Sequence, residues 1–269
     1  MNQKTFLIES VSVELARNFC RESVFGIVND RIEIARQVLL AVLSSRIRWE
    51  VACRIVDGLF VHLVEALGEQ KCSAIDLRYR KRAIRKLVSC HRHPKLAQLW
   101  VFDLLCNSDS KFMEVLSLIT SDMDVLEIRR SVIQLVKGLG PKQSSLLLRN
   151  IGRGKHIAVI DRHILSFMRL LKLIPENTEP SSMRSYECHE SAFLSYAAFR
   201  RLPPDTLDLA IWVVMRTVRL EKANEHCDLG FGRPRFNSHG RAMCGGEDFS
   251  VSSLHKLRAE GIWKGIGGL

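Results

Sequence analysis

The sequence contains no run of about 18 or more consecutive apolar residues, which is the length that a membrane-crossing helix needs. Its first residues, Met1–Lys4, also lack the long apolar run and the small-residue cleavage site of a secretory signal peptide. These absences predict a protein that is soluble, located in the cytoplasm and without a membrane partner.

Aromatic residues are scarce as well, at 7% of the 269 residues, and so is the strict apolar–polar alternation of half-buried strands. Apolar residues reach 46% and recur at spacings of three and four along much of the chain, as in amphipathic helices. A chain of this length and composition can bury a substantial core, so global disorder is excluded. We expect an all-α fold, either one large domain or two helical lobes with a cleft between them.

The cysteines include no C-x-x-C pair, and the closely spaced set of four that holds an iron–sulfur cluster is missing. We therefore expect no disulfide framework, and we expect the cysteines to be small core residues in a reducing compartment. Cys90-His91-Arg92-His93 is the one metal-like cluster, but neighbouring residues at a helix end point in different directions. The sequence thus predicts no metal site. The eight cysteines are Cys20, Cys53, Cys72, Cys90, Cys106, Cys188, Cys227 and Cys244.

The charges are unbalanced, because 40 Lys and Arg against 29 Asp and Glu give a formal net charge of +11. A helical protein this basic usually binds a polyanion, with nucleic acid as the first candidate and an anionic membrane surface as the second. A surface that is basic for solubility alone is the other alternative. Arg78, Arg82, Arg85 and Lys86 fall at helical spacing, so they can share one face and contact a phosphate backbone. A solvated helix face would explain the same pattern.

The apolar pattern and the capping residues predict further helices, and Ser121-Asp122 is expected to cap the one that begins at Val125. After Cys227 the sequence is rich in Gly and Arg and loses its periodicity. We therefore divide the chain into a helical domain of two subdomains, residues 1–226, and a C-terminal extension, residues 227–269. The predicted helices cover Val11–Asn18, Ile32–Ser44, Arg46–Leu67, Pro94–Leu105, Val125–Val136, Pro141–Asn150, Asp161–Lys172, Ser181–Arg201 and Pro204 to about Lys222.

Gly138-Leu139-Gly140 lies between two of these helices and predicts a hairpin of the helix-hairpin-helix type. The glycines permit backbone conformations that a side chain would forbid and let the backbone come close to a ligand. Pro141 suits the first position of the following helix because its missing N–H would be unpaired there anyway. The remaining N–H groups at that helix start form an anion site, and a DNA phosphate is its natural occupant.

Lys142 lies in the first turn of the second hairpin helix, where the helix dipole and any desolvation disfavour a charged amine. An amine that is partly neutral near pH 7 can attack a carbon atom and form a Schiff base. The lysine could equally be a surface residue near a phosphate.

Asp161 follows the apolar run 157–160 and opens a helix. One interpretation is an N-cap that accepts hydrogen bonds from the N–H groups of His163 or Ile164. The other is a catalytic carboxylate that faces a reacting sugar. The two roles are compatible, because a capping carboxylate is held in place.

The segments GLGPKQSSLLLRNIG (138–152) and AVIDRHIL (158–165) resemble the signature of the helix-hairpin-helix DNA glycosylases. The particular branch is the archaeal-type second family of 8-oxoguanine DNA glycosylase/lyases. In that motif the lysine after the hairpin is the nucleophile and the aspartate of the second segment is the catalytic carboxylate. The resemblance therefore implies that Lys142 and Asp161 are the catalytic residues.

Two further segments resemble this family, residues 43–50 at its base pocket and residues 207–212 in its final helix. The chain continues for more than forty residues past Lys222, whereas members of the family end soon after the final helix. The residues expected at the base pocket are Ser44, Ser45, Trp49, Asp208 and Trp212. Those expected to contact DNA are Gly138, Leu139, Gly140, Arg82, Arg85 and Arg149.

The resemblance implies a bifunctional glycosylase/lyase that excises 8-oxoguanine or a related modified guanine from double-stranded DNA, with no cofactor. Its active cleft is expected between the two helical lobes. The long C-terminal extension motivates an alternative, a repurposed subunit that binds nucleic acid or a protein partner in a bacterial defence or modified-guanine system. A purely structural DNA-binding module is the third interpretation, but binding alone requires neither Lys142 nor Asp161.

Overall fold

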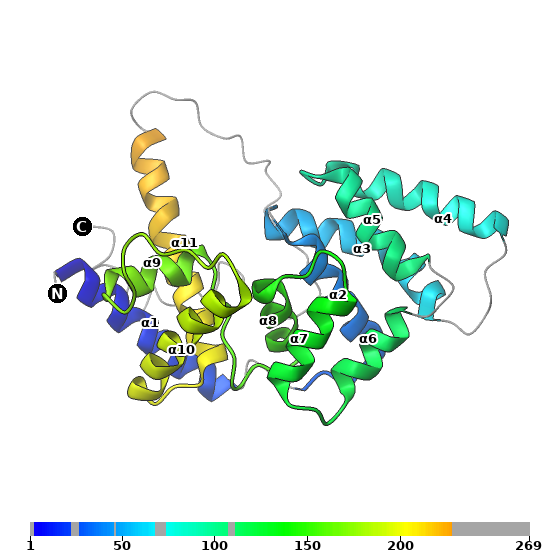
Figure 1. Cartoon of the computed structure of the whole chain (residues 1–269). Coiled ribbons are helices and arrows are strands. Elements are labelled where there is room, and N and C mark those ends of the chain that lie inside the picture. Colours follow the sequence, from blue (N-terminus) through cyan, green and yellow to red (C-terminus); the bar gives the residue numbers. More distant parts are fainter. Residues whose placement is uncertain (1–2, 23–26, 46, 68–73, 107–110, 228–269) are drawn as a thin grey trace. The chain divides into compact units, whose positions relative to one another are not determined.

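A computed structural model describes residues 3–22, 27–45, 47–67, 74–106 and 111–227 of the chain (Figure 1). These ranges contain helices and no strand, which confirms the prediction of an all-α fold. None of the described helices is long and apolar enough to cross a membrane. The helices are α1 (Gln3–Glu22), α2 (Arg31–Leu43), α3 (Trp49–Leu67), α4 (Ala74–Leu87), the short 3₁₀ helix η1 (Val88–Cys90), α5 (Pro94–Leu105), α6 (Lys111–Thr120), α7 (Val125–Leu135), α8 (Pro141–Asn150), α9 (Arg162–Leu170), α10 (Met183–Arg200) and α11 (Pro204–Cys227).

The chain forms two compact units. The central unit is residues 25–159 and contains α2 to α8, so it carries the predicted hairpin and Lys142. The terminal unit combines α1 with the described residues from Ile160 to Cys227, which contain α9 to α11. Asp161 therefore belongs to the terminal unit.

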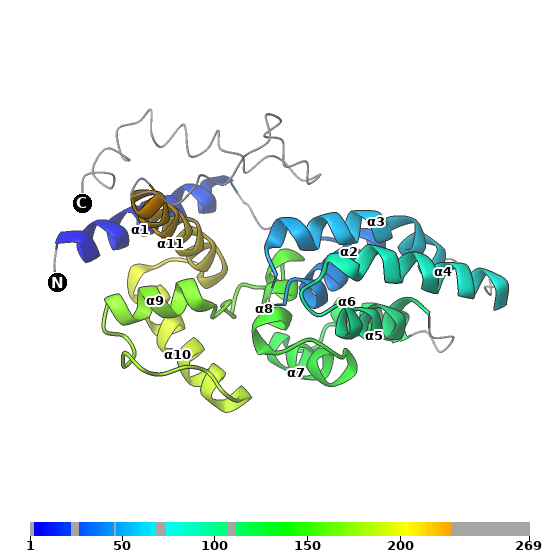
Figure 2. The same cartoon turned by 90° about the horizontal axis from the view of Figure 1, so that it is seen from above.

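Helix α2 forms the core of the central unit and packs against α3, α5, α6 and α8 (Figure 2). A helix that is apolar on all sides is stable only when other elements surround it. The sequence gives α2 this character, because its second half is an uninterrupted apolar run that is buried from Val38 to Leu43. The Asp30 side chain caps the helix by accepting a hydrogen bond from the Ile32 N–H at 3.0 Å. The hairpin is thus built against the most buried helix of its unit.

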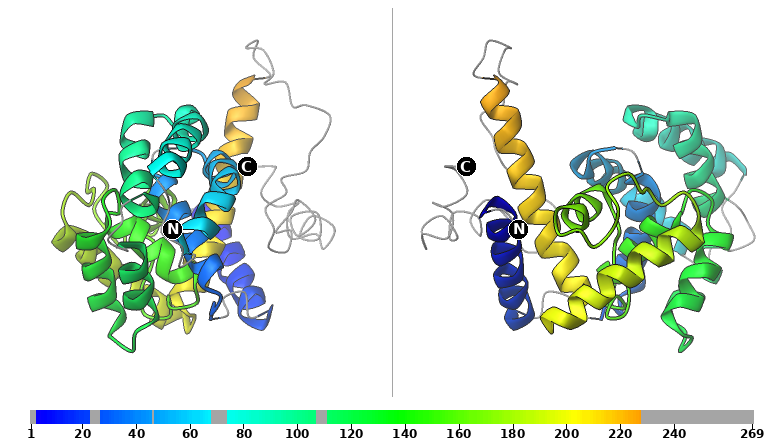
Figure 3. Two further views of the ribbon diagram at one scale, coloured as in Figure 1. Left: turned by 90° about the vertical axis from the view of Figure 1, so that its right-hand side faces the viewer. Right: turned by 60° about the vertical axis from the view of Figure 1, so that its left-hand side comes forward.

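In the terminal unit, α1 lies along α11 (Figure 3), and α11 also packs against α9 and α10. A buried polar cluster joins α1 to α10. The Tyr196 hydroxyl donates to Glu9 Oε1 at 2.8 Å, and the Arg200 guanidinium forms an ion pair with the same oxygen. Burial, followed by the contact with Glu9, raises the pKa of Tyr196. These contacts attach the first helix of the chain to a unit whose other helices begin only at Arg162.

One helix and one N-cap differ from the predictions made from the sequence. Helix α6 was not predicted, although Phe112, Val115, Leu116 and Ile119 show the spacing of an amphipathic helix and are all buried. The prediction that Ser121-Asp122 caps α7 is wrong. Asp124 is the N-cap, because its carboxylate accepts from the Leu126 N–H at 2.8 Å.

The cysteines only partly fit the prediction of small core residues. Of the five whose surroundings are described, Cys53 is buried and Cys20 and Cys106 are partly buried. Cys90 and Cys188 are exposed, so for these two the prediction is wrong. The reason is that a helix places successive residues on different faces, and neither of the two falls on the apolar face of its helix.

Candidate active site

The predicted hairpin consists of α7, a short turn and α8. Gly138 has a φ of 91°, a left-handed conformation that favours glycine. A Cβ at this position would lie 2.6 Å from the indole ring of Trp100, so the turn also needs glycine for space. Leu139 is buried, and its N–H donates to the Val136 carbonyl at 3.3 Å. The first glycine is therefore a requirement of the fold.

Gly140 is different, because it is the N-cap of α8 with an ordinary φ of −106°. A Cβ there would meet only Gln143 Oε1, at 3.4 Å, so its own surroundings would accept a small side chain. No side chain caps α8 at this end. The N–H groups of a first helical turn have no carbonyl partner within the helix. Together with the helix dipole, they form a site that suits an anion.

Lys142 is the second residue of α8, partly exposed, in the same helical turn as this anion site. The buried Arg129 of α7 donates to the Ser145 hydroxyl of α8 at 3.2 Å. The Ser144 hydroxyl donates to the Gly140 and Pro141 carbonyls at 3.0 and 2.9 Å. These contacts join the two hairpin helices and reinforce the turn that carries Lys142.

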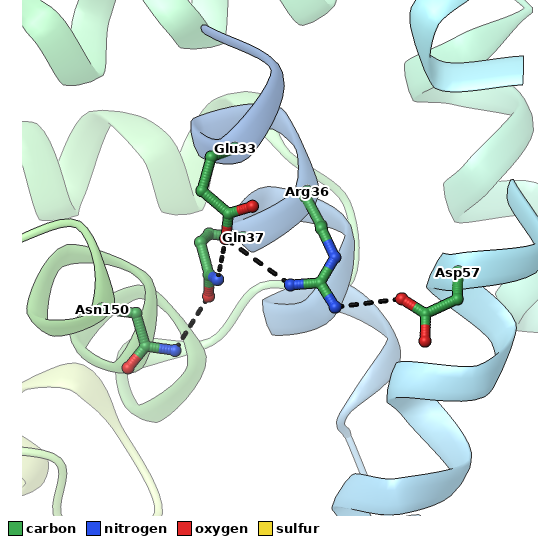
Figure 4. Close-up of polar contacts among 5 residues, drawn as sticks. All are labelled: Glu33, Arg36, Gln37, Asp57 and Asn150. Carbon is green, nitrogen blue, oxygen red and sulfur yellow. Dashed lines mark hydrogen bonds and ion pairs between the residues drawn. The ribbon is translucent and has the colours of Figure 1, made fainter. Parts of the chain in front are cut away.

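The far end of α8 is attached to α2 by a chain of polar contacts (Figure 4). The Asn150 side chain donates to Gln37 at 3.0 Å, and Gln37 donates to Glu33 at 2.6 Å. Arg36 forms ion pairs with Glu33 at 3.5 Å and with Asp57 of α3 at 2.9 Å. Since α2 is the core helix of the unit, this chain fixes the helix on which Lys142 stands.

The hairpin turn also rests on a buried histidine. His91 is 3% exposed, its Nε2 lies 3.2 Å from the Leu43 carbonyl, and its Nδ1 accepts from the His93 N–H at 3.0 Å. Its ring packs edge-on against Trp100, the residue that covers Gly138. Burial lowers the pKa of His91. A neutral ring that donates from Nε2 satisfies both contacts, so His91 supports the end of α2 and the hairpin together.

In the described part of the chain no group of three or more His, Cys, Asp or Glu could hold a metal ion. In the Cys90–His93 cluster, both ring nitrogens of His91 already contact the backbone.

Asp161 is the N-cap of α9, as predicted. Its Oδ1 accepts hydrogen bonds from the His163 and Ile164 N–H groups at 2.7 and 3.0 Å, and the residue is 9% exposed. The preceding run is buried from Ile157 to Ile160, and the Ile160 N–H donates to the Tyr186 hydroxyl at 3.0 Å. The carboxylate is therefore held by the N–H groups that follow it, and the backbone that precedes it is held by Tyr186.

The five residues predicted for the base pocket fall in both units. Ser44, Ser45 and Trp49 lie in the central unit, at the end of α2 and the start of α3, and all three are partly exposed. In α11 of the terminal unit, Asp208 is fully buried and Trp212 is partly exposed. Ser44 and Ser45 follow the end of α2 and Trp49 begins α3, while Asp208 and Trp212 are four residues apart on α11. Their union into one pocket stays a prediction.

The predicted basic face on α4 is exposed, since Arg78, Arg82, Arg85 and Lys86 all reach the surface. The guanidinium of Arg85 also packs 5.7 Å from the ring centroid of Phe102. Its neighbour Arg80, on the opposite side of the helix, is buried and donates to the Leu105 carbonyl at 3.1 Å.

Arg149 was predicted to contact DNA, and this contact stays a prediction. It is 9% exposed, and the loop after α8 folds back over it. A Cβ at Gly154 in this loop would lie 2.7 Å from Arg149 Cα.

These features define a helix-hairpin-helix protein. Residues 32–201 match the family model of the 8-oxoguanine DNA glycosylases, which covers more than half of the chain. The chain therefore belongs to this family, which confirms the resemblance seen in the motifs.

Two relatives illustrate the extent of the similarity. The chain is 34% identical over 107 residues to the 8-oxoguanine DNA glycosylase/AP lyase of Fusobacterium nucleatum, covering 38% of the chain and 49% of that protein. It is 26% identical over 188 residues to the corresponding protein of Korarchaeum cryptofilum, covering 68% of the chain and 79% of that protein. The chain thus matches about half the length of the first of these relatives.

Solved structures share the fold. The 8-oxoguanine DNA glycosylase of Thermotoga maritima matches with a TM-score of 0.52 and 20% identity, over 77% of this chain and 87% of that one. The glycosylase/lyase of Methanocaldococcus jannaschii, in complex with a 15mer DNA containing 8-oxoguanine, matches with a TM-score of 0.55 and 19% identity, over 78% and 90%.

The two hairpin glycines give a first testable prediction. Gly138→Ala should destabilise the protein by about 1–3 kcal/mol, because it forces a side chain into the left-handed region and against Trp100. Gly140→Ala should melt close to wild type, because its surroundings accept a methyl group, yet it should weaken DNA binding about tenfold by holding the phosphate away from the amides. Thermal unfolding and DNA titration of both variants test the pair. Equal melting temperatures for the two variants would contradict the separate roles of the two glycines.

Proposed function

We propose that this protein is a bifunctional DNA N-glycosylase and abasic-site lyase that excises 8-oxoguanine or a related modified guanine. The observation that carries the proposal is the local setting of two residues within the family-matched segment 32–201. Lys142 stands in the uncapped first turn of the second hairpin helix, and Asp161 is held by the first turn of α9. The names of the relatives, which are 8-oxoguanine DNA glycosylase/AP lyases, support the same substrate.

Binding would begin at the phosphate backbone. The amides at the start of α8 receive one phosphate, and the exposed basic face of α4 adds positive charge. A base inside the duplex is out of reach of the catalytic groups. It therefore has to swing out of the helix, at a cost of a few kcal/mol that contacts in a base pocket repay. Ser44, Ser45, Trp49, Asp208 and Trp212 are the proposed pocket residues.

The chemistry then follows from the two catalytic residues. The Asp161 carboxylate stabilises the positive charge that develops on the sugar as the bond between C1′ and the base breaks. The Lys142 amine attacks C1′ as the base departs and loses a proton to the base. The C1′–O4′ bond of the sugar then breaks, O4′ takes up a proton, and the nitrogen attached to C1′ becomes an imine. The imine acidifies the C2′ proton, whose removal eliminates the 3′ phosphate and cuts the strand. This sequence of steps needs no metal ion and no organic cofactor.

The alternative of a repurposed subunit with a protein partner depends on the C-terminal extension. Residues 228–269 lie outside the described residues, so both this alternative and the proposed division at residue 227 stay predictions. Failure of the wild-type protein to form a covalent adduct with DNA would favour the repurposed subunit.

The role of Lys142 predicts a covalent intermediate. Wild-type protein, mixed with an 8-oxoguanine duplex and borohydride, should form a protein–DNA adduct, because the hydride reduces the imine. Lys142→Gln should abolish the adduct and leave DNA binding within a few-fold of wild type. Lys95→Gln, which removes an exposed lysine of α5, is the matched control and should retain the full yield. An undiminished adduct in Lys142→Gln would refute the assignment of the nucleophile.

Asp161 requires a variant that separates capping from catalysis. Asp161→Asn keeps an oxygen that can accept from the His163 and Ile164 N–H groups, so the free energy of unfolding should fall by about 1 kcal/mol or less. Base excision should nevertheless drop by orders of magnitude, because the negative charge is removed. Asp124→Asn changes the N-cap of α7 in the same way and should leave excision nearly unchanged. If the two variants reduced activity equally, Asp161 would be a cap alone.

The basic face of α4 predicts a salt dependence. Replacing both Arg82 and Arg85 by Gln should reduce the slope of log K against log salt by about one for each phosphate that the variant no longer neutralises. Arg17→Gln, on α1 and already paired with Glu14, is the control and should leave the slope unchanged. DNA titrations over a series of salt concentrations measure the slopes. An unchanged slope in the double variant would place this face away from DNA.

A further inference from the structure

A cluster of aromatic and cation–π contacts beside Asp161 includes one arginine that the motifs do not identify. The His163 N–H donates to Asp161, and the His163 ring lies 6.3 Å from the Trp212 ring at an interplanar angle of 76°. The Arg216 guanidinium lies over the Trp212 ring, 4.9 Å from its centroid. All four residues belong to the terminal unit, so their arrangement is fixed by the packing of α9 against α11.

The position of Arg216 has a simple local cause. It follows Trp212 by four residues on α11, and residues at this spacing lie on the same helix face. A guanidinium is planar and weakly hydrated, so it can stack on an indole through its face and still donate hydrogen bonds from its edge. Both residues are partly exposed, so the stack reaches the surface. The result is a fixed cation on the residue that we place at the base pocket.

We propose that Arg216 is a catalytic residue for release of the base, an inference that rests on the proposed function. Its guanidinium donates hydrogen bonds to carbonyl oxygens of the modified purine and stabilises the negative charge that the base acquires as it leaves. When the bond between N9 and C1′ breaks, its electron pair goes to the base. Lys142 forms the new bond to C1′, and the proton that its nitrogen loses neutralises the departing base. Arg216 keeps its own protons throughout.

This role makes Arg216 specific to one half of the reaction. When a purine with carbonyl oxygens leaves the sugar, much of its negative charge lies on those oxygens. A guanidinium interacts with this charge most strongly when it donates hydrogen bonds to the oxygens. An abasic site has no base to stabilise. Cutting at an abasic site depends on Lys142 and Asp161 alone, and it should proceed without help from Arg216.

The experiment compares the two half-reactions in the full-length protein under single-turnover conditions. Arg216→Met should slow release of 8-oxoguanine from a duplex by about a hundredfold, the range seen when one oriented donor is removed. Cutting of a preformed abasic duplex, and its borohydride adduct, should stay within about twofold of wild type. Arg216→Lys keeps the charge without the planar stack, so it should recover part of the rate. Arg184→Met removes an exposed arginine of α10 and should match wild type on both substrates.

The outcomes separate this inference from the proposed function. Unchanged base release in Arg216→Met would overturn the role of Arg216. An equal reduction of cutting on the abasic duplex would also overturn it, because it would indicate a structural effect of the substitution. If the wild-type protein forms no adduct with the abasic duplex, the proposed function fails and this inference fails with it. A selective reduction of base release, partly restored in Arg216→Lys, supports it.

Discussion

The first turn of a helix exposes N–H groups that the helix itself cannot satisfy, and each of the two catalytic candidates stands at such a turn. At α9 the turn is satisfied from within the chain, because Asp161 accepts from two of its N–H groups. At α8 the N-cap is Gly140, which has no side chain to offer. One helix start thus fixes a carboxylate, and the other is suited to an external anion. This difference gives the two catalytic candidates their separate settings.

Each setting depends on packing behind it. In the central unit, α8 is joined to α7 through Arg129 and Ser145 and to α2 through Asn150 and Gln37. The turn before it rests on Trp100, which also packs against His91. In the terminal unit, the segment before Asp161 is buried and bonded to Tyr186. The functional groups therefore stand at helix ends that hydrogen bonds and packing hold in place, which favours precise placement of a reacting group.

Most structural features that depend on neighbouring residues could be predicted from the sequence. The helix-hairpin-helix turn, the start of α8 at Pro141 and the cap at Asp161 all depend on residues within a few positions of one another. Predictions that depended on distant packing were less successful. The exposure of Cys188, which was expected in the core, depends on which face α10 turns to its neighbours. No local pattern contains this information. Arg216 illustrates the same limit, because its spacing from Trp212 is visible in the sequence, whereas the approach of His163 to Trp212 depends on the packing of α9 on α11.

The placement of the arginines also refines the argument from net charge. A charge of +11 predicts affinity for a polyanion, but it does not show which cations are available. Arg80 and Arg129 are buried and donate to the Leu105 carbonyl and to Ser145, so part of the positive charge serves the fold. The exposed cations of α4 remain at the surface of the same unit as the hairpin amides. Under the proposed function, affinity for DNA should therefore follow the position of these few side chains and not the total charge.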